Sequence, residues 1–300
     1  MSVRALPGRA ETVSDGVITR SRRARVMRQV RRRPIETVGL FIIFGVMFLA
    51  VAADLVAPAS YAAQDFASRL QGPNGAHFFG TDSLGRDVFS RIIYGARTSM
   101  MASSAGVLIS ATLGGVFGVS SGFFGGKYDL VLQRVTDSIH SVPLLLMAMI
   151  IIVALGASLF NVSLALGLIG ATTVNRIVRG STLAVKASPY VEAATSLGAT
   201  PSRIVMRHIV PNILAPLIVV SSIQFGAFIT AEAALSFLGL GVPPPMPSWG
   251  GMLSADGRAF FLKAPWLAIF PGVAISLTVL ATNLVGDALR DILDPRQRGS

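Results

Sequence analysis

Residues 138–175 read SIHSVPLLLMAMIIIVALGASLFNVSLALGLIGATTVN, a run of 38 residues without Lys, Arg, Asp or Glu. A helix rises about 1.5 Å per residue, so one helix of this length would measure about 57 Å, against a bilayer hydrocarbon core of about 30 Å. The run therefore predicts two membrane-spanning helices joined by a turn. Residues 156–161, which include Gly, Ser and Asn, are the best place for that turn.

Four further stretches of low charge extend this pattern along the chain. They lie at residues 38–57, 98–126, 209–231 and 266–286, and each is long enough to cross a bilayer. The composition agrees, because 52% of the residues are hydrophobic and 14% are charged, against roughly 25% charged in typical soluble domains. These observations exclude a soluble globular protein and predict an all-α integral membrane protein with six transmembrane helices.

The first of these stretches has a second interpretation, the h-region of a signal peptide, since residues 50–52 (Ala-Val-Ala) look cleavable. Such h-regions are usually about 7–15 residues long and follow a short basic segment. The stretch at 38–57 is longer and follows a long tail, which favours a retained membrane span.

Basic residues are unevenly distributed around the predicted spans. Residues 1–37 contain 10 of the 26 Lys and Arg. If this tail is cytoplasmic, the segments predicted inside hold 20 of these residues and those predicted outside hold 6. The positive-inside rule then places both termini in the cytoplasm. Membrane lipid is a secondary partner that the tail suggests. Nucleic acid is disfavoured because no folded reading module accompanies the charge.

The chain is expected to divide into five segments. They are a basic cytoplasmic tail (1–37), a first transmembrane helix (38–57), an external segment with an interfacial helix (58–97), a core of five helices (98–287) and a cytoplasmic C-terminal tail (288–300). The interfacial helix is predicted to be capped by Asp82 or Ser83 and to have one apolar face. The side chains of that face are Leu84, Val88, Phe89, Ile92 and Ile93.

The longest segment predicted on the cytoplasmic side, residues 176–208, contains signals for two short helices. Ser188 followed by Pro189 predicts a helix that ends at Gly198. Thr200 followed by Pro201 predicts a second helix, which runs toward the membrane.

The first of these helices has a small, apolar face formed by Val191, Ala194 and Thr195, with Glu192 at its edge. Such a face suits docking into a groove on another protein. A loop folded back on its own chain fits the same pattern equally well. The residues alone do not choose between the two.

The same segment resembles a known motif. Glu192-Ala193-Ala194, three residues, Gly198, nine residues and then residues 208–211 (His-Ile-Val-Pro) resemble the EAA loop of ABC-importer permeases. That family pattern reads Glu-Ala-Ala, three residues, Gly, nine residues, Ile, any residue, Leu-Pro. The chain departs from it at His208 and Val210, and His at the first position is typical of the peptide-transport branch.

Further segments resemble C-type permeases of the dipeptide, oligopeptide and nickel transport family. They are residues 79–91 (FGTDSLGRDVFSR), 235–241 (LSFLGLG), 283–291 (NLVGDALRD) and 293–296 (LDPR). The resemblance covers about residues 30–297. It implies the type I ABC importer permease fold in the cytoplasmic (inner) membrane of a prokaryote.

The resemblance also implies partners and roles. The chain would pair with a sister B-type permease, dock one or two ATPase subunits that hold ATP and Mg, and receive solute from an extracytoplasmic solute-binding protein. It would bind no cofactor or metal itself and would not be an enzyme. Dipeptides, oligopeptides, nickel chelates, haem and glutathione remain candidate substrates. The residues expected in the coupling loop, 186–211, are Tyr190, Val191, Glu192, Ala193, Ala194, Leu197, Gly198, Arg203 and Pro211.

Two sequence patterns bear on an enzymatic alternative. Lys127, Lys186 and Lys263 are followed by Tyr, Ala and Ala, so none belongs to a P-loop, and the energy for transport must come from a partner. Residues 118–122 match the Gly-x-Ser-x-Gly pattern of serine hydrolases, but that chemistry needs a nearby base. Helix packing is the favoured interpretation, because glycine recurs at every fourth position. The glycines concerned are Gly114, Gly118 and Gly122, followed by Gly126.

The main alternative function is a stand-alone secondary transporter or channel. Such a carrier is expected to have ionisable residues near the membrane midplane. The acidic residues Asp54, Asp137, Glu232 and Asp287 all fall near predicted span ends. Glu232 is the best candidate for a gate or a contact with a substrate amine, with an ordinary interfacial carboxylate as its plainer interpretation.

Overall fold

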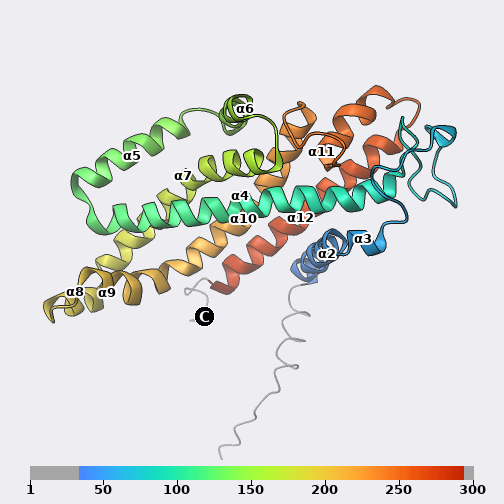
Figure 1. Ribbon diagram of the computed structural model, residues 1–300. Helices are drawn as coiled ribbons and strands as arrows, with labels where there is room; N and C mark the ends of the chain where they lie inside the picture. Colours follow the sequence, from blue (N-terminus) through green and yellow to red (C-terminus); the bar gives the residue numbers. More distant parts are fainter. Residues whose placement is uncertain (1–33, 294–300) are drawn as a thin grey trace, which may run out of the picture. The chain divides into compact units, whose positions relative to one another are not determined.

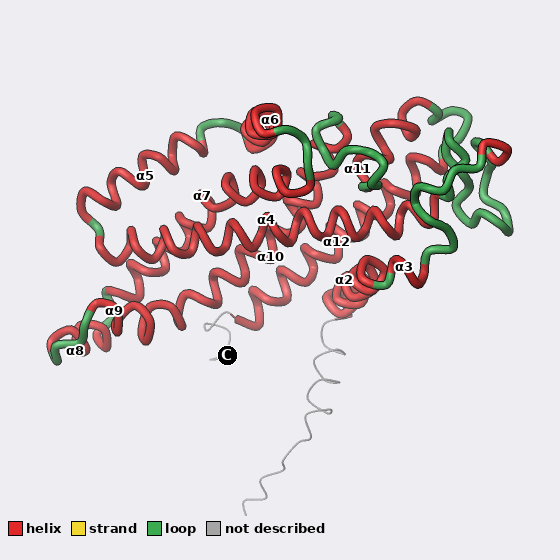
Figure 2. Tube along the Cα trace, in the orientation of Figure 1, coloured by secondary structure: helices red, strands yellow, loops and turns green. Residues whose placement is uncertain are grey.

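The computed structural model describes residues 34–293. Most of the predicted basic tail, residues 1–33, and the end of the C-terminal tail, residues 294–300, lie outside the described residues. Within residues 34–293 the chain consists of helices and connecting loops, with one isolated bridge between Thr81 and Asp87 (Figure 2). The predicted all-α membrane fold is confirmed.

Helices follow one another along the whole described chain (Figure 1). They are α2 (Pro34–Val51), α3 (Ala53–Val56), η1 (Phe66–Ser68), α4 (Val88–Phe124), α5 (Gly126–His140), α6 (Leu144–Leu155), α7 (Leu159–Lys186), α8 (Pro189–Ser196), α9 (Pro201–Ile204), η2 (Val205–Ile209), α10 (Val210–Phe237), α11 (Trp249–Met252), η3 (Leu253–Gly257) and α12 (Trp266–Leu293). Five runs are long and apolar enough to cross a membrane, namely α2, α4, α7, the run from α9 to α10, and α12.

The third predicted span is a bent pair of helices rather than one straight helix. α5 and α6 meet at an angle of 92° around residues 141–143. With 12 residues, α6 measures only about 18 Å and cannot cross a hydrocarbon core of about 30 Å alone. Within the described residues, the candidate spans number five, or six if this bent pair is one broken span. The turn predicted at 156–161 is confirmed, because α6 ends at Leu155 and α7 starts at Leu159.

The predicted interfacial helix capped by Asp82 or Ser83 is wrong. The helix starts at Val88, where the Asp87 side chain accepts a hydrogen bond from the Ser90 amide, and it continues without a break to Phe124. Asp82 instead stabilises a turn, because its carboxylate accepts hydrogen bonds from the amides of Leu84 and Arg86. The interfacial helix and the second span are therefore one helix of 37 residues.

The fifth span is also longer than predicted. α9, η2 and α10 form one run from Pro201 to Phe237, so the second short helix of the loop merges with the span. η2 is a π-helical turn at Val205–Ile209. Pro211 lacks the amide hydrogen that would bond to residue 207 in an α-helix, and the wider turn just before it accommodates this loss.

The long helices pack in a consistent order. α4 and α7 lie side by side over most of their length, and α10 packs against α4, α7 and α12 (Figure 1). One apolar cluster, which includes Ile152, Leu166 and Phe228, joins α6, α7 and α10. At the opposite end from α8, Ser83 donates a hydrogen bond of 2.6 Å to Asp256 and thereby joins the segment before α4 to η3.

Candidate coupling loop and the helices that support it

α8 is a short helix whose ends are both defined by local sequence. Pro189 occupies its first turn, and Ser188 stands at the N-cap in extended backbone geometry. The Ser188 hydroxyl does not cap the helix, however, because it donates to the carbonyl oxygen of Val185. After the helix, Gly198 has a φ of +78°, a conformation that favours glycine.

One side of α8 is fixed to the membrane helices. Val191 is only 3% exposed and packs in an apolar cluster contributed by α7, α9, η2 and α10. The other buried members of this cluster are Val174, Val178, Ile204, Ile209, Ile213 and Val220. Val191, which the sequence placed on an exposed docking face, therefore faces inward, since burial of its side chain holds the short helix in position.

The other side of α8 is open to solvent. Tyr190 and Ala193 are exposed, and Leu197, at the end of the helix, is 88% exposed. These positions lie on one helical face by their spacing. Glu192 is exposed as well. The two interpretations of the loop thus apply to different faces, because one side folds back on the chain and the other remains available.

A hollow of about 460 Å³ adjoins α8. Val191, Glu192 and Lys186 are among its lining residues. The Lys186 ammonium donates a hydrogen bond of 2.6 Å to the carbonyl oxygen of Phe123 and stands 5.4 Å from the centre of the Phe123 ring. The end of α7, directly before α8, is in this way tied to the end of α4.

A polar seam, which the sequence reasoning missed, joins α5 to α7. Its strongest contact is between Arg179 and Asp129, where two nitrogens of the guanidinium donate to the two carboxylate oxygens at 2.6 and 2.5 Å. Such bidentate pairs are stronger than single hydrogen bonds and fix orientation. Arg176 pairs with Asp137 at 3.1 Å one turn away along α7.

Next to these two ion pairs lies a buried amide. Asn175 is 3% exposed and donates from Nδ2 to Thr136 at 3.3 Å and to Gln133 at 3.4 Å. On α5 the polar residues of the seam are spaced at i, i+4, i+7 and i+8, which is one helical face. That spacing is the signal in the sequence that could have found the seam.

Glu232 lies in a buried cluster of serines, five residues before the end of α10. Its side chain is fully buried, and its carboxylate accepts hydrogen bonds from Ser99 at 2.8 Å and from Ser236 at 2.7 Å. Ser236 in turn accepts from Ser248, directly before α11, at 3.2 Å. The carboxylate is therefore enclosed by protein, since α11 packs against this end of α10.

The glycines of α4 lie against α7. A Cβ atom on Gly118 would come within 2.8 Å of the Asn175 carbonyl oxygen, and one on Gly114 within 2.6 Å of the Ala171 carbonyl oxygen. At Gly122 the nearest atom would be Cβ of Thr182, at 2.8 Å. The close approach of the two helices thus depends on the absence of side chains at these three positions.

Ser120 shows no arrangement suited to a nucleophile. Its hydroxyl donates to the carbonyl oxygen of Phe117 and lies 3.0 Å from the hydroxyl of Tyr128. Neither partner can act as the required base. Across residues 34–293 there is also no group of three His, Asp or Glu side chains that could hold a metal ion.

Comparison with known proteins identifies the family. Residues 114–299 match the family described as binding-protein-dependent transport system inner membrane component. Residues 21–73 match the N-terminal TM domain of oligopeptide transport permease C.

Individual relatives agree with these matches. The chain is 40% identical over 271 residues to the dipeptide transport system permease protein DppC of Alkalihalophilus pseudofirmus, covering 90% of this chain and 89% of the relative. It is 41% identical over 269 residues to a putative peptide transport system permease protein of Brucella suis, covering 90% of each. It is 40% identical over 276 residues to the glutathione transport system permease protein GsiD of Escherichia coli, covering 91% and 90%.

These matches, together with the apolar helices long enough to cross a membrane, settle the class of protein. They indicate a multi-pass protein of the bacterial inner membrane that does not itself hydrolyse ATP, and they imply separate ATPase and substrate-binding partners. The chain belongs to the family of binding-protein-dependent transport inner-membrane components and is a permease subunit of an ABC importer.

Proposed function

We propose that this chain forms one half of a heterodimeric pore with a sister B-type permease and carries dipeptides, oligopeptides or glutathione-like solutes into the cytoplasm. The substrate class is supported by relatives that are named for dipeptide, peptide and glutathione transport. Both termini and α8 lie in the cytoplasm in this proposal, as the distribution of Lys and Arg favours. ATP and Mg bind to the partner subunits.

The open face of α8 is the docking surface for the ATPase subunits in this proposal. The observation that carries it is that the buried Val191 anchors α8, whereas Tyr190 on the helix and Leu197 directly after it are exposed. A helix anchored in this way transmits a pull, whereas a free loop would bend. The cluster around Val191 contains residues of α7 and α10, so displacement of α8 moves both helices.

We expect a Leu197→Asp variant to lose the ATPase partner during co-purification, because a charge would replace the most exposed apolar side chain of the docking face. Leu262→Asp is the matched control. Leu262 is 98% exposed in the loop between η3 and α12, at the end of the helices away from α8, so a charge there leaves the ATPase bound. The measurement is the amount of ATPase recovered with the tagged permease, followed by ATP hydrolysis in the recovered complex.

Equal recovery with both variants would show that the ATPase docks elsewhere. A chain that purifies without any ATPase and moves solute in proteoliposomes without ATP would overturn the importer proposal in favour of a secondary transporter.

Glu232 acts as a gate in this proposal, since it connects α4, α10 and α11. We expect Glu232→Ala to destabilise the complex, because Ser99 and Ser236 lose a buried acceptor and each unsatisfied hydroxyl costs about 1–3 kcal/mol. Glu232→Gln retains an acceptor oxygen and has a smaller effect. Thermal unfolding of the detergent-solubilised complex measures both.

Transport assays distinguish the gate from a contact with substrate. A gate that only holds the serines tolerates Glu232→Gln in transport as well as in stability. A Glu232→Gln complex that unfolds at the wild-type temperature yet transports at a small fraction of the wild-type rate would instead indicate a carboxylate that binds the substrate amine.

A further inference from the structure

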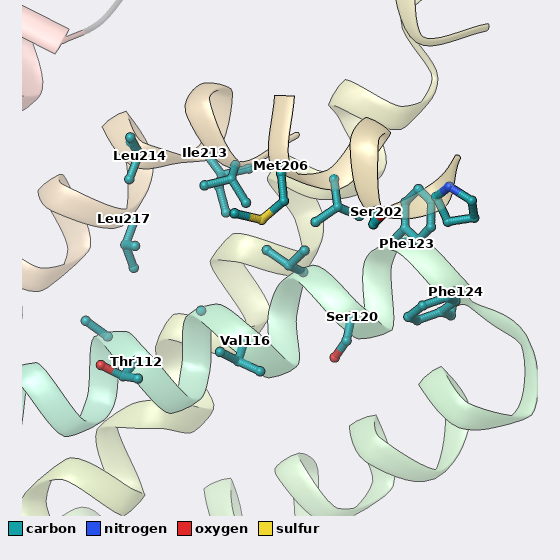
Figure 3. Close-up of a pocket in the computed structure, with 16 residues that line it drawn as sticks. Thr112, Val116, Ser120, Phe123, Phe124, Ser202, Met206, Ile213, Leu214 and Leu217 are labelled. Atoms are coloured by element: carbon teal, nitrogen blue, oxygen red, sulfur yellow. The ribbon is translucent and has the colours of Figure 1, made fainter. Parts of the chain in front are cut away.

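A groove of about 680 Å³ runs between α4 and the run from α9 to α10 (Figure 3). Eight residues between positions 111 and 124 line one wall, and eight between positions 201 and 217 line the other. The labelled side chains Met206 and Leu217 lie in the space between the two helix runs. Both walls belong to membrane-spanning runs, so the groove lies at least partly within the bilayer.

The groove exists partly because α4 has a glycine on this face. A Cβ atom on Gly115 would meet no atom closer than Leu217 Cδ2, at 4.0 Å, so space is left where a larger residue would fill it. The neighbouring glycines of α4 are instead packed against α7. Gly115 is therefore not required for the approach of two helices.

The walls do not suit a peptide substrate. Apart from backbone, the polar atoms on them are the hydroxyls of Thr112, Ser120 and Ser202, and that of Ser120 already bonds to the carbonyl oxygen of Phe117. Peptide groups placed there would lose their hydrogen bonds with water and gain few in return. An apolar occupant, in contrast, gains by burial of its surface against these side chains.

The size of the groove favours a single lipid acyl chain as its occupant over a transmembrane helix of another protein. Pockets for one small ligand have volumes of about 300–1,000 Å³, and this groove falls in that range. A transmembrane helix with its side chains is about 10 Å wide and about 30 Å long, which amounts to several times that volume. A helix of the sister permease could lie across the opening but could not enter it.

Positive charge lies at one end of the groove. Lys186 stands over the ring of Phe123, which lines the groove. Arg203 and Arg207 directly follow the lining residues Ser202 and Met206, and both are exposed. Within residues 34–293, none of the three cations is paired with a carboxylate. The far end of the groove, near Ala111 and Leu217, is lined by uncharged residues.

We propose that this groove binds one acyl chain of an anionic phospholipid, whose phosphate lies among Lys186, Arg203 and Arg207. The apolar walls contact the acyl chain, and the cations at one end of the groove bind the phosphate of the headgroup. Because Pro201 and Phe123 line both this groove and the hollow beside α8, the bound lipid lies next to the coupling loop. The proposal depends on the membrane location of the chain and not on its substrate or partners.

The test is native mass spectrometry of the detergent-solubilised full-length protein, titrated with phosphatidylglycerol or phosphatidylcholine. We expect the wild-type protein to prefer phosphatidylglycerol. Arg203→Gln and Arg207→Gln should each reduce that preference about fivefold, the value of one cation near an anionic headgroup. Both changes leave binding of the acyl chain intact, so binding of phosphatidylcholine should be unaffected.

Gly115→Leu tests the acyl-chain part of the proposal. It should abolish binding of both lipids, because the leucine side chain fills the groove. Gly272→Leu is the matched control, since Gly272 is also a glycine in a membrane-spanning helix and a Cβ atom added to it would have no atom within 4 Å. This control should bind lipid as the wild type does. Thermal unfolding of all variants checks that they remain folded.

Two results would overturn the proposal. One is a Gly115→Leu variant that remains folded and binds phosphatidylglycerol as tightly as the wild type. The other comes from Val116→Cys, which places one cysteine in a chain that otherwise has none. Efficient disulfide crosslinking of this cysteine to a cysteine scan of the sister permease, without bound lipid in the complex, would show that a protein helix covers the groove.

Discussion

A Gly118→Ala variant is expected to unfold at a clearly lower temperature than the wild type, although it adds only one methyl group. The new Cβ atom would lie 2.8 Å from both the Asn175 carbonyl oxygen and Cβ of Val178. The carbonyl oxygen cannot rotate away, so α4 and α7 must separate. Overpacking of this kind costs about 1–3 kcal/mol, a large part of a net stability of about 5–15 kcal/mol.

The matched control is Gly115→Ala, three residues earlier on the same helix. Its Cβ atom would meet only Leu217 Cδ2, at 4.0 Å, so its unfolding temperature should remain close to that of the wild type. Adding Gly114→Ala to Gly118→Ala should lower the unfolding temperature further, because both methyl groups press on α7. Size-exclusion chromatography after heating measures all four proteins. Equal unfolding temperatures for Gly118→Ala and Gly115→Ala would contradict the packing role of these glycines.

Gly198→Val is expected to uncouple ATP hydrolysis from transport while the complex still assembles. Gly198 has a φ of +78°, and a left-handed conformation costs a residue with a side chain about 1–2 kcal/mol. The space around it is open, with no atom within 4 Å of a Cβ atom, so the strain is conformational and not a clash. The turn after α8 relaxes, the docking face changes its angle, and the pull of the ATPase no longer reaches α10.

The assay compares ATP hydrolysis and solute uptake in the same proteoliposomes. Gly198→Asn is the first control, because asparagine tolerates a left-handed conformation and should keep uptake near the wild-type level. Gly156→Val is the second, since Gly156 has a φ of +88° and equally open surroundings but lies between α6 and α7, far along the chain from α8. Loss of the ATPase from Gly198→Val would assign this turn to assembly and not to coupling.

The sequence was informative about the spans because a helix must be apolar and about 20 residues long to cross the hydrocarbon core of a bilayer. Residues 138–175 are too long for one helix, and the turn between α6 and α7 falls where that length and the turn residues place it. The residues at which helices start were harder to predict from the sequence. Asp82 and Asp87 are equally good caps on sequence, and the choice of Asp87 depends on tertiary contacts of the preceding turn, such as the hydrogen bond from Ser83 to Asp256.

The sequence predicted the bounds of α8 but not the direction in which its side chains face. The bounds of α8 follow from Pro189 and Gly198, which act within a few residues of themselves. The direction that Val191 faces does not, because it is decided by an apolar cluster that includes α10. The spacing of polar residues on α5 could have indicated a polar seam, but a single sequence does not show that Arg179, 50 positions from Asp129, is its partner.

The unbroken length of α4 has a mechanical consequence. At 37 residues it measures about 55 Å, so it extends well past a hydrocarbon core of about 30 Å. Ser99, eleven residues after the start of the helix, holds α4 to Glu232, and Phe123, the residue before its last, accepts a hydrogen bond from Lys186. If a stiff helix of this length tilts about a point within the bilayer, its two ends move in opposite directions. A single tilt of α4 would then open the protein on one side of the membrane and close it on the other. No separate signal would be needed to coordinate the two sides.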